Sequence, residues 1–262
     1  MSSIQPYLET HNSKKADAED LVLLHGWGLH SGIWNLLLDE LTKHCRVHLI
    51  DLPGFGRSPI PSGDYDLELL TEQVLKVAPA KAHYLGWSLG GVVATNIALT
   101  QADRVAKLIT VASSPKFVQS EDWPCGMKPN IMDSFCRFLE EDYQGTIIRF
   151  LAIQAMGSET QKEDIRLLKD TVFVHGTPAT KALRDGLNML SDVDLRQGLA
   201  RLTMPRLRLY GRLDTLVPNK AAQAIQDIDP QSSFKVYPKA SHAPFLTNRA
   251  EFTQDLIHFL NQ

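Results

Sequence analysis

Short apolar runs alternate along the chain with stretches that carry the spacing of amphipathic helices. Several of these runs are apolar at both alternating positions, which is typical of parallel strands buried on both faces. The predicted strands are Leu21–Leu24, Arg46–Ile50, His83–Leu85, Lys107–Val111, Arg206–Tyr210 and Phe234–Tyr237. The predicted helices are Ile33–Lys43, Leu67–Val77, Ser88–Thr100, Lys220–Asp227 and Ala250–Leu260. This alternation predicts an α/β fold with a mostly parallel central sheet, right-handed crossovers and helices on both faces.

One long segment departs from the alternation. Residues from about 117 to 190 show helical patterns and no convincing strand. Within this segment, Ser158 followed by Gln161 predicts a capping box at the start of a helix. An insertion here would cover the carboxyl ends of the strands, where open α/β sheets bind ligands. We therefore expect a single domain over 1–262, with a core of 1–116 and 191–262 and a helical cap (lid) insertion at about 117–190.

Composition and charge exclude several classes of protein. The chain has 27 Lys and Arg against 30 Asp and Glu, a net charge of -3, so it lacks the cationic excess of a nucleic-acid binder. Its three cysteines, Cys45, Cys125 and Cys136, are too few and too scattered for a disulfide framework or a thiolate metal site. The polar N-terminus does not resemble a targeting peptide, and no apolar stretch approaches the roughly 20 residues that span a bilayer. We expect a cytoplasmic monomer that binds neither nucleic acid nor membrane.

The strongest chemical signal is the run Gly86-Trp87-Ser88-Leu89-Gly90, which matches G-x-S-x-G. An apolar strand pattern precedes it and a helical pattern follows, as a nucleophile elbow requires. Such a turn lifts the serine hydroxyl above the sheet and places it at a helix N-terminus, where negative charge is favoured. The glycines permit close approach of the neighbouring backbone. The alternative is a glycine-rich turn with an incidental serine.

A serine nucleophile needs a base and an acid that orients the base. Among nine histidines, His242 lies in a loop after the last predicted strand and before a helix, where the base of G-x-S-x-G hydrolases arrives. Asp214 follows the next-to-last predicted strand and fits the order serine, acid, histidine. We expect His25 to shape the loop after the first predicted strand instead of performing catalysis. Competing acids lie in or just after the cap, where solvated helix ends explain them: Asp185, Asp192 and Asp194.

An oxyanion would need two N–H donors. One is expected from Leu89, the residue after the nucleophile, and the other from the loop after an early strand. That loop reads His25-Gly26-Trp27-Gly28, so we expect Trp27 to supply the second donor. The Trp27 side chain could equally be a core aromatic or a wall of the acyl pocket. Chemistry of this kind requires no metal and no organic cofactor.

The ordered motifs HGWG, DLPGFGRS, GWSLGG, YGRLD and SHAPF resemble those of an α/β-hydrolase with a lid. Together with TVASSP, RFLAIQAMGSET, VDLRQ and LRLYGRLDTLVP, they are more specifically similar to the pimeloyl-acyl-carrier-protein methyl ester esterase family of biotin synthesis. The similarity covers nearly everything from Leu21 onward and includes the lid. The first twenty residues are longer and more polar than the family pattern, which leaves their role open.

The resemblance implies hydrolysis of a methyl ester at the far end of a pimeloyl chain that is carried by acyl carrier protein. It implies an acyl-contacting segment at Phe150, Leu151, Ala152, Ile153 and Gln154, with Trp27, Ser88, Leu89 and His242 completing the site. Packing within the cap would explain the apolar members equally well. Two other functions stay open: a general short-chain carboxylesterase or carbon–carbon bond hydrolase, and a receptor that keeps a hydrolase pocket.

A basic stripe in the cap is a candidate contact for the acidic carrier. Lys162, Arg166 and Lys169 stand at i, i+4 and i+7, on one helix face. Arg149 lies just before the acyl-contacting segment. The alternative is a solvated face of mixed charge, because acidic residues share the helix: Glu159, Glu163, Asp164 and Asp170.

Overall fold

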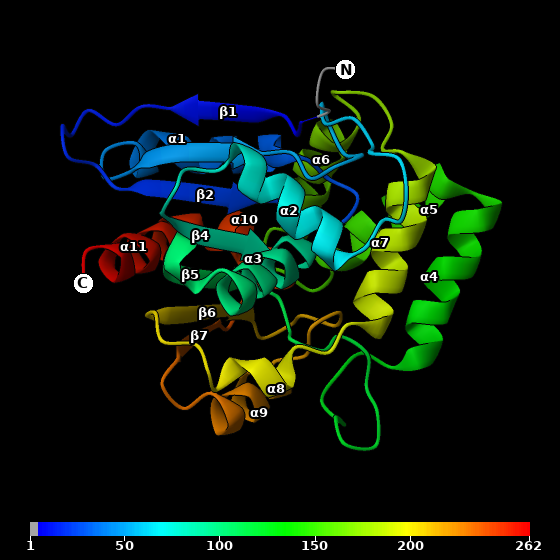
Figure 1. The fold of residues 1–262 in the computed structure, drawn as a ribbon. Helices are drawn as coiled ribbons and strands as arrows, with labels where there is room; N and C mark the ends of the chain where they lie inside the picture. The colour runs from blue at the N-terminus through cyan, green and yellow to red at the C-terminus, as the bar shows by residue number, and fades with distance from the viewer. Residues whose placement is uncertain (1–4) are drawn as a thin grey trace.

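The central sheet of the protein is mostly parallel. The computed structural model describes residues 5–262, and within them one seven-stranded sheet has the order β1-β3-β2-β4-β5-β6-β7 (Figure 1). β1 runs antiparallel to β3, and every other neighbouring pair is parallel. The strands are β1 (Leu8–His11), β2 (Asp20–Leu24), β3 (Arg46–Ile50), β4 (Ala82–Trp87), β5 (Val105–Val111), β6 (Arg206–Gly211) and β7 (Ser233–Tyr237). The predicted sheet and its last six strands are confirmed.

Helices lie on both faces of this sheet, as predicted. In Figure 1, α2 and α3 lie on the viewer's side, and α1 and α11 lie behind the sheet. The 3₁₀ segments are η1 (Ser31–Trp34) and η2 (Ala102–Arg104). The α-helices are α1 (Asn35–Leu41), α2 (Leu67–Val77), α3 (Leu89–Thr100), α4 (Pro129–Glu141), α5 (Tyr143–Gln154), α6 (Gln161–Val172), α7 (Thr180–Asp192), α8 (Arg196–Leu199), α9 (Lys220–Ile228), α10 (Pro244–Thr247) and α11 (Arg249–Leu260). None of the helices in the described part of the chain is long and apolar enough to cross a bilayer.

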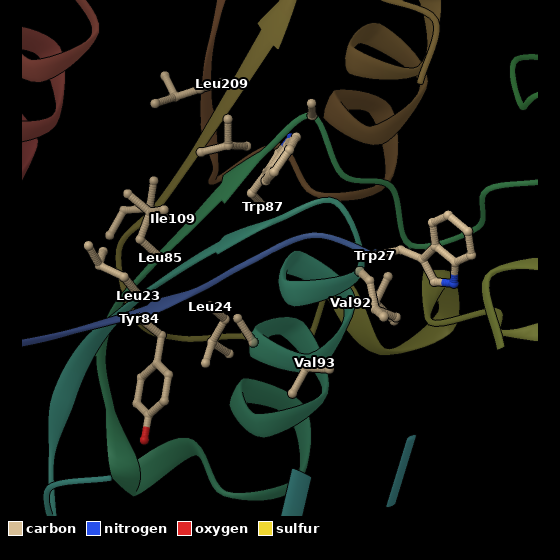
Figure 2. Packing of buried hydrophobic residues seen from close by; sticks show 14 of the residues in the cluster. Leu23, Leu24, Trp27, Tyr84, Leu85, Trp87, Val92, Val93, Ile109 and Leu209 are labelled. Atoms are coloured by element: carbon tan, nitrogen blue, oxygen red, sulfur yellow. The ribbon is translucent and has the colours of Figure 1, made fainter. Parts of the chain in front are cut away.

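The core is built on strands that are apolar on both sides. Every residue of β4 is buried, and the register sets Leu23 beside Leu85 and Leu85 beside Ile109. Figure 2 shows these leucine and isoleucine side chains on one face, with Leu24 on the other face beside α3. Because α3 is almost wholly apolar, it can be buried over the sheet directly behind the G-x-S-x-G turn.

Helices α4 to α7 occupy the chain between β5 and β6, in agreement with the predicted helical segment. They lie beyond the carboxyl ends of the strands (Figure 1), and α4 packs against both α5 and α7. The predicted capping box is wrong, because Thr160 is the N-cap of α6 and makes no side-chain capping bond. Ser158 Oγ instead donates to the buried Asp164, whose carboxylate also accepts from Thr160 and from Thr247 of α10. This carboxylate ties α6 to the segment after β7.

β1 was not predicted from the sequence. Its residues are half-exposed or exposed, and it lies at the sheet edge, where one row of backbone groups has no partner strand. Two hydrogen bonds beside β1 anchor it: Tyr7 N–H donates to Ser58 Oγ at 2.7 Å, and Asp51 N–H donates to Tyr7 O at 3.1 Å. The Arg57 guanidinium stacks 3.6 Å from the Tyr7 ring centroid. Part of the polar N-terminal segment is therefore an edge strand.

The loops after β2 and β3 are joined through the buried side chain of His25. Leu52 N–H donates to His25 Nε2 at 2.9 Å, so the ring proton lies on Nδ1, which donates to Gly26 O at 2.8 Å. A second proton would have to enter at Nε2, against the Leu52 N–H. Burial lowers the pKa of His25 to about 4, although the nearby Asp51 carboxylate opposes this shift. The neutral imidazole thus holds the loop that contains Trp27.

This geometry predicts a loss of stability in mild acid. Below the ordinary histidine pKa of about 6.5 the unfolded chain takes up a proton at His25 while the folded chain does not, so stability falls with pH. Between about pH 7.5 and about pH 5 the contribution of His25 amounts to roughly 2 kcal/mol of unfolding free energy. Urea unfolding at both pH values should show a shallower pH dependence for His25→Gln than for the wild type. The exposed His258→Gln serves as the matched control, and equal slopes in all three proteins would contradict this role of His25.

Candidate active site

The turn between β4 and α3 places Ser88 in a strained backbone conformation. Its φ is 53° and its ψ is -116°, which an L-residue adopts only when its surroundings impose it. Ser88 N–H donates to Val111 O of β5 at 2.9 Å, and Ser113 Oγ donates to Ser88 O at 2.8 Å. The Ser88 side chain is buried beneath the cap. This is the backbone geometry of a nucleophile elbow.

Glycines make the turn possible because neighbouring backbone segments lie too close to it for a side chain to fit. A Cβ atom on Gly90 would lie 2.5 Å from Leu24 O and 2.6 Å from His25 O. A Cβ on Gly86 would collide with the carbonyl of Gly90. The end of β2 and the start of α3 therefore pack directly against the elbow.

His242 and Asp214 form a buried pair at the carboxyl end of the sheet. His242 Nδ1 donates to Asp214 Oδ2 at 2.8 Å, and the side chains are 1% and 0% exposed. The other carboxylate oxygen, Oδ1, accepts from the backbone N–H groups of Leu216 at 2.8 Å and Val217 at 2.9 Å. Because the carboxylate takes the Nδ1 proton, Nε2 is left with a lone pair. Nε2 is buried and makes no hydrogen bond within residues 5–262.

The backbone of His242 is held from two sides. Its N–H donates at 2.9 Å to the carbonyl of Gln154, the last residue of α5 in the cap. Its carbonyl accepts at 2.9 Å from Nε1 of Trp87, the residue before Ser88. The Trp87 and His242 rings lie 5.7 Å apart. The loop of the candidate base is thus connected to the elbow and to the cap.

Leu89 and Trp27 are the predicted oxyanion donors, and the structure shows how their N–H groups are placed in the hydrogen-bond network. As the first residue of α3, Leu89 has an N–H without an intrahelical partner. The Trp27 backbone N–H donates to no group in the described residues. The Trp27 side chain is fully buried, and its Nε1 donates to Leu183 O of α7 at 2.8 Å. A Cβ on Gly186, also in α7, would lie 3.0 Å from Trp27 Cδ1, so the cap rests on this indole.

A small apolar cavity adjoins Ser88 and brings together residues from distant parts of the chain. Phe150 of α5 lines it and stacks edge-on against Trp27, with ring centroids 4.9 Å apart. Leu151 and Gln154 are buried, and Ala152 and Ile153 are half-buried, but none of these residues lines the cavity. Sequence reasoning missed the other lining residues because no local motif marks them: Phe117, Met127, Met132, Phe135, Leu187, Leu190 and Leu216.

The competing acidic residues are engaged elsewhere. Asp185 pairs with Lys181 at 2.6 Å in α7, and Asp194 pairs with Arg196 at 2.6 Å. Asp192 is exposed at the end of α7. In the described part of the chain, no group of three or more His, Cys, Asp or Glu side chains is arranged to hold a metal ion.

The candidate carrier contacts lie on the surface of the cap. Arg149 of α5 and Lys162, Arg166 and Lys169 of α6 are all exposed. α5 packs against α6, so the four cations belong to adjoining elements. Several apolar side chains are also exposed on these helices and on the loops that follow them: Ile148, Met156, Leu167, Phe173 and Val174.

Comparisons with known proteins identify the fold family and the relatives of this chain. The family model of the alpha/beta hydrolase fold matches residues 21–249. The pimeloyl-[acyl-carrier protein] methyl ester esterase of Aeromonas salmonicida is 48% identical over 242 residues, covering 92% of this chain and 95% of the relative. That of Pectobacterium atrosepticum is 50% identical over 244 residues, covering 92% and 93%.

A solved structure supports the same fold at greater distance. An esterase from Exiguobacterium antarcticum superposes with a TM-score of 0.85 at 24% identity, covering 98% of this chain and 96% of that one. At that identity the likeness concerns the fold, whereas the curated relatives identify the family. The chain therefore belongs to the pimeloyl-[acyl-carrier protein] methyl ester esterase family, within the α/β-hydrolases.

Proposed function

We propose that this protein hydrolyses the methyl ester of pimeloyl-[acyl-carrier protein] to methanol and pimeloyl-[acyl-carrier protein], as a step of biotin synthesis. The names of relatives that are about half identical over nearly the whole chain support the substrate. One observation carries the chemistry: Asp214 takes the Nδ1 proton of His242 and leaves the buried Nε2 without a partner, on a loop tied to the serine elbow.

Acylation follows from these positions. Ser88 Oγ attacks the ester carbonyl carbon while its proton passes to Nε2 of His242. Asp214 keeps the imidazole in the required tautomer and stabilises the imidazolium that forms. The N–H groups of Trp27 and Leu89 hold the oxyanion of the tetrahedral intermediate. When this intermediate collapses, methanol leaves with the proton from His242.

Deacylation repeats the sequence with water. His242 takes a proton from water as its oxygen attacks the Ser88 ester, and the same N–H groups hold the second oxyanion. Collapse returns the proton to Ser88 Oγ and frees the carboxylic acid, which is still joined to the carrier at the other end of the chain. No redox step occurs, and each proton taken by His242 is given back.

The cap provides the acyl site in this proposal. Residues 117–190 serve as the cap of a single domain whose core comprises 1–116 and 191–262. The apolar cavity beside Ser88 supports this, because its lining comes from both parts. Phe150 is the member of the acyl-contacting segment with direct support from the cavity, and Leu151, Ala152, Ile153 and Gln154 are proposed to contact the remainder of the chain.

Removing the triad should abolish turnover. Because Ser88 and His242 act as a unit, Ser88→Ala, His242→Ala and the double variant should each lower kcat by about a million-fold. Asp214→Asn should lower kcat by about ten-thousand-fold, because the amide favours the wrong tautomer of His242. Initial rates on a methyl ester, with folding checked by circular dichroism, measure these losses.

The competing acid supplies the matched control. Asp185→Asn should retain turnover within a few-fold of the wild type, because its carboxylate pairs with Lys181 and Arg184. If Asp185→Asn were severe and Asp214→Asn mild, the acid would have been assigned to the wrong residue. Ser88→Ala that hydrolyses esters at the wild-type rate would exclude the serine mechanism.

We further propose that Arg149, Lys162, Arg166 and Lys169 contact the acidic carrier. Electrostatic steering by such a patch acts mainly on the association rate and weakens with salt. Arg149→Glu combined with Arg166→Glu should therefore lower kcat/KM on the carrier-bound ester by about ten-fold or more, and leave a small free methyl ester unaffected. The loss should shrink at high ionic strength.

A second double variant tests whether the effect depends on where the charge is changed or only on the change in net charge. Lys76→Glu with Lys81→Glu changes the net charge equally, and Lys81 directly precedes β4 at the amino ends of the strands, opposite the cap. This control should leave both substrates unaffected. Equal losses on both substrates in the cap variant would indicate a damaged cap instead of a carrier site.

The wild-type enzyme distinguishes the alternative functions. A preference for short free esters over the carrier ester would favour a general carboxylesterase, and a single turnover would favour a receptor.

A further inference from the structure

We propose that Trp87 is a positioning residue for the catalytic base: its indole N–H holds the backbone of His242 in register with Ser88. The inference rests on the proposed function of His242 as general base. Trp87 occupies the variable position of G-x-S-x-G, to which the motif itself assigns no chemical role. It is fully buried, and its Nε1 donates to the His242 carbonyl at 2.9 Å.

This hydrogen bond is one of three that fix His242. The side chain is oriented by Asp214 through Nδ1, and the backbone N–H is bound by the carbonyl of Gln154. The carbonyl is the remaining polar group of His242, and without a partner it would leave the peptide after His242 free to change its orientation. Trp87 binds this carbonyl inside a buried site, where a hydrogen bond is strong and an unpaired carbonyl is costly.

The bond also sets the distance between base and nucleophile. Adjacent Cα atoms are fixed about 3.8 Å apart by the trans peptide, so the indole of Trp87 starts from a point rigidly joined to Ser88. One peptide unit, one rigid side chain and one hydrogen bond therefore connect Ser88 to the His242 backbone. Displacement of a catalytic group by about 1 Å can lower a rate by about a hundredfold. A short, stiff connection of this kind is what proton transfer between the two residues requires.

Aromatic packing is the competing explanation, and the molecule contains its own control for it. Trp87 lies in a cluster with Trp34 and Phe245, at centroid distances of 6.4 Å and 5.0 Å. Trp34 is also fully buried and lies 4.6 Å from Phe245. Its Nε1, however, has no hydrogen-bond partner in the described residues. The two tryptophans thus share side chain, burial and cluster but differ in the bond to His242.

The test compares Trp87→Phe with Trp34→Phe on two esters of one short acyl group, a methyl ester and a p-nitrophenyl ester. Trp87→Phe should lower kcat on the methyl ester by about ten- to a hundredfold with KM changed less than about twofold. Both esters form the same acyl-enzyme and share its deacylation step, so they are compared by kcat/KM, which reports acylation alone. The loss of kcat/KM should be smaller on the p-nitrophenyl ester, because nitrophenolate leaves without a proton from His242, whereas methanol needs one. Trp34→Phe should stay within about twofold of the wild type on both esters.

Three results would overturn the proposal: equal losses in the two variants, equal losses of kcat/KM on the two esters, or an unchanged kcat of Trp87→Phe on the methyl ester. If Trp87→Phe does not fold, replacing Trp87 by β-(3-benzothienyl)alanine removes the N–H and keeps the ring shape, and the same comparison applies. Failure of the proposed function is recognised separately, because the wild type would then hydrolyse the small esters and leave the carrier-bound methyl ester intact.

Discussion

The turn at Ser88 brings β4, α3 and the end of β2 closer together than side chains normally allow. A left-handed φ at a non-glycine residue costs of the order of 1–3 kcal/mol, and it persists only where the surroundings impose it. Here the Ser88 carbonyl accepts from the N–H groups of Gly91 and Val92 and from Ser113 Oγ, while its N–H donates to β5. Hydrogen bonds in the buried centre of the sheet therefore stabilise the strained conformation. The turn in this way fixes the position of Ser88 relative to the other residues of the site.

The proposed base, His242, is positioned by less regular structure than the serine turn. His242 follows the last strand in a loop, and its anchors come from β4, from the loop after β6 and from the cap helix α5. The buried carboxylate of Asp164 adds a further tie, because it links α6 to Thr247 of α10, the helix that begins just after His242. The cap helices thus help to position the proposed base, His242, as well as lining the cavity.

The sequence predicted those elements that have a periodic hydrophobic pattern and those residues that lie in a local motif. Strands such as Arg46–Ile50 and helices such as Leu67–Val77 were predicted to the residue, because buried parallel strands and amphipathic helices have strong periodic signals. β1 was missed because an edge strand buries too little to show that signal. The capping box at Ser158 failed because a tertiary contact, the buried Asp164 carboxylate, takes the hydroxyl that the local rule assigns to the helix start. The order of motifs brought Ser88, Asp214 and His242 to notice, but Met127, Met132 and Leu187 meet at the cavity only through the folding of the cap.

The contact between Trp27 and α7 bears on how this enzyme could diversify. The indole donates to Leu183 O, and a Cβ on Gly186 would lie only 3.0 Å from Trp27 Cδ1, so the cap and the loop proposed to supply an oxyanion donor share one interface residue. A cap transplanted from a distant hydrolase would have to present a carbonyl and a small residue at these same two places. Exchange of whole lids by recombination is therefore restricted to donors whose helix matches Trp27, and new substrate preferences are more accessible through point changes at the cavity wall.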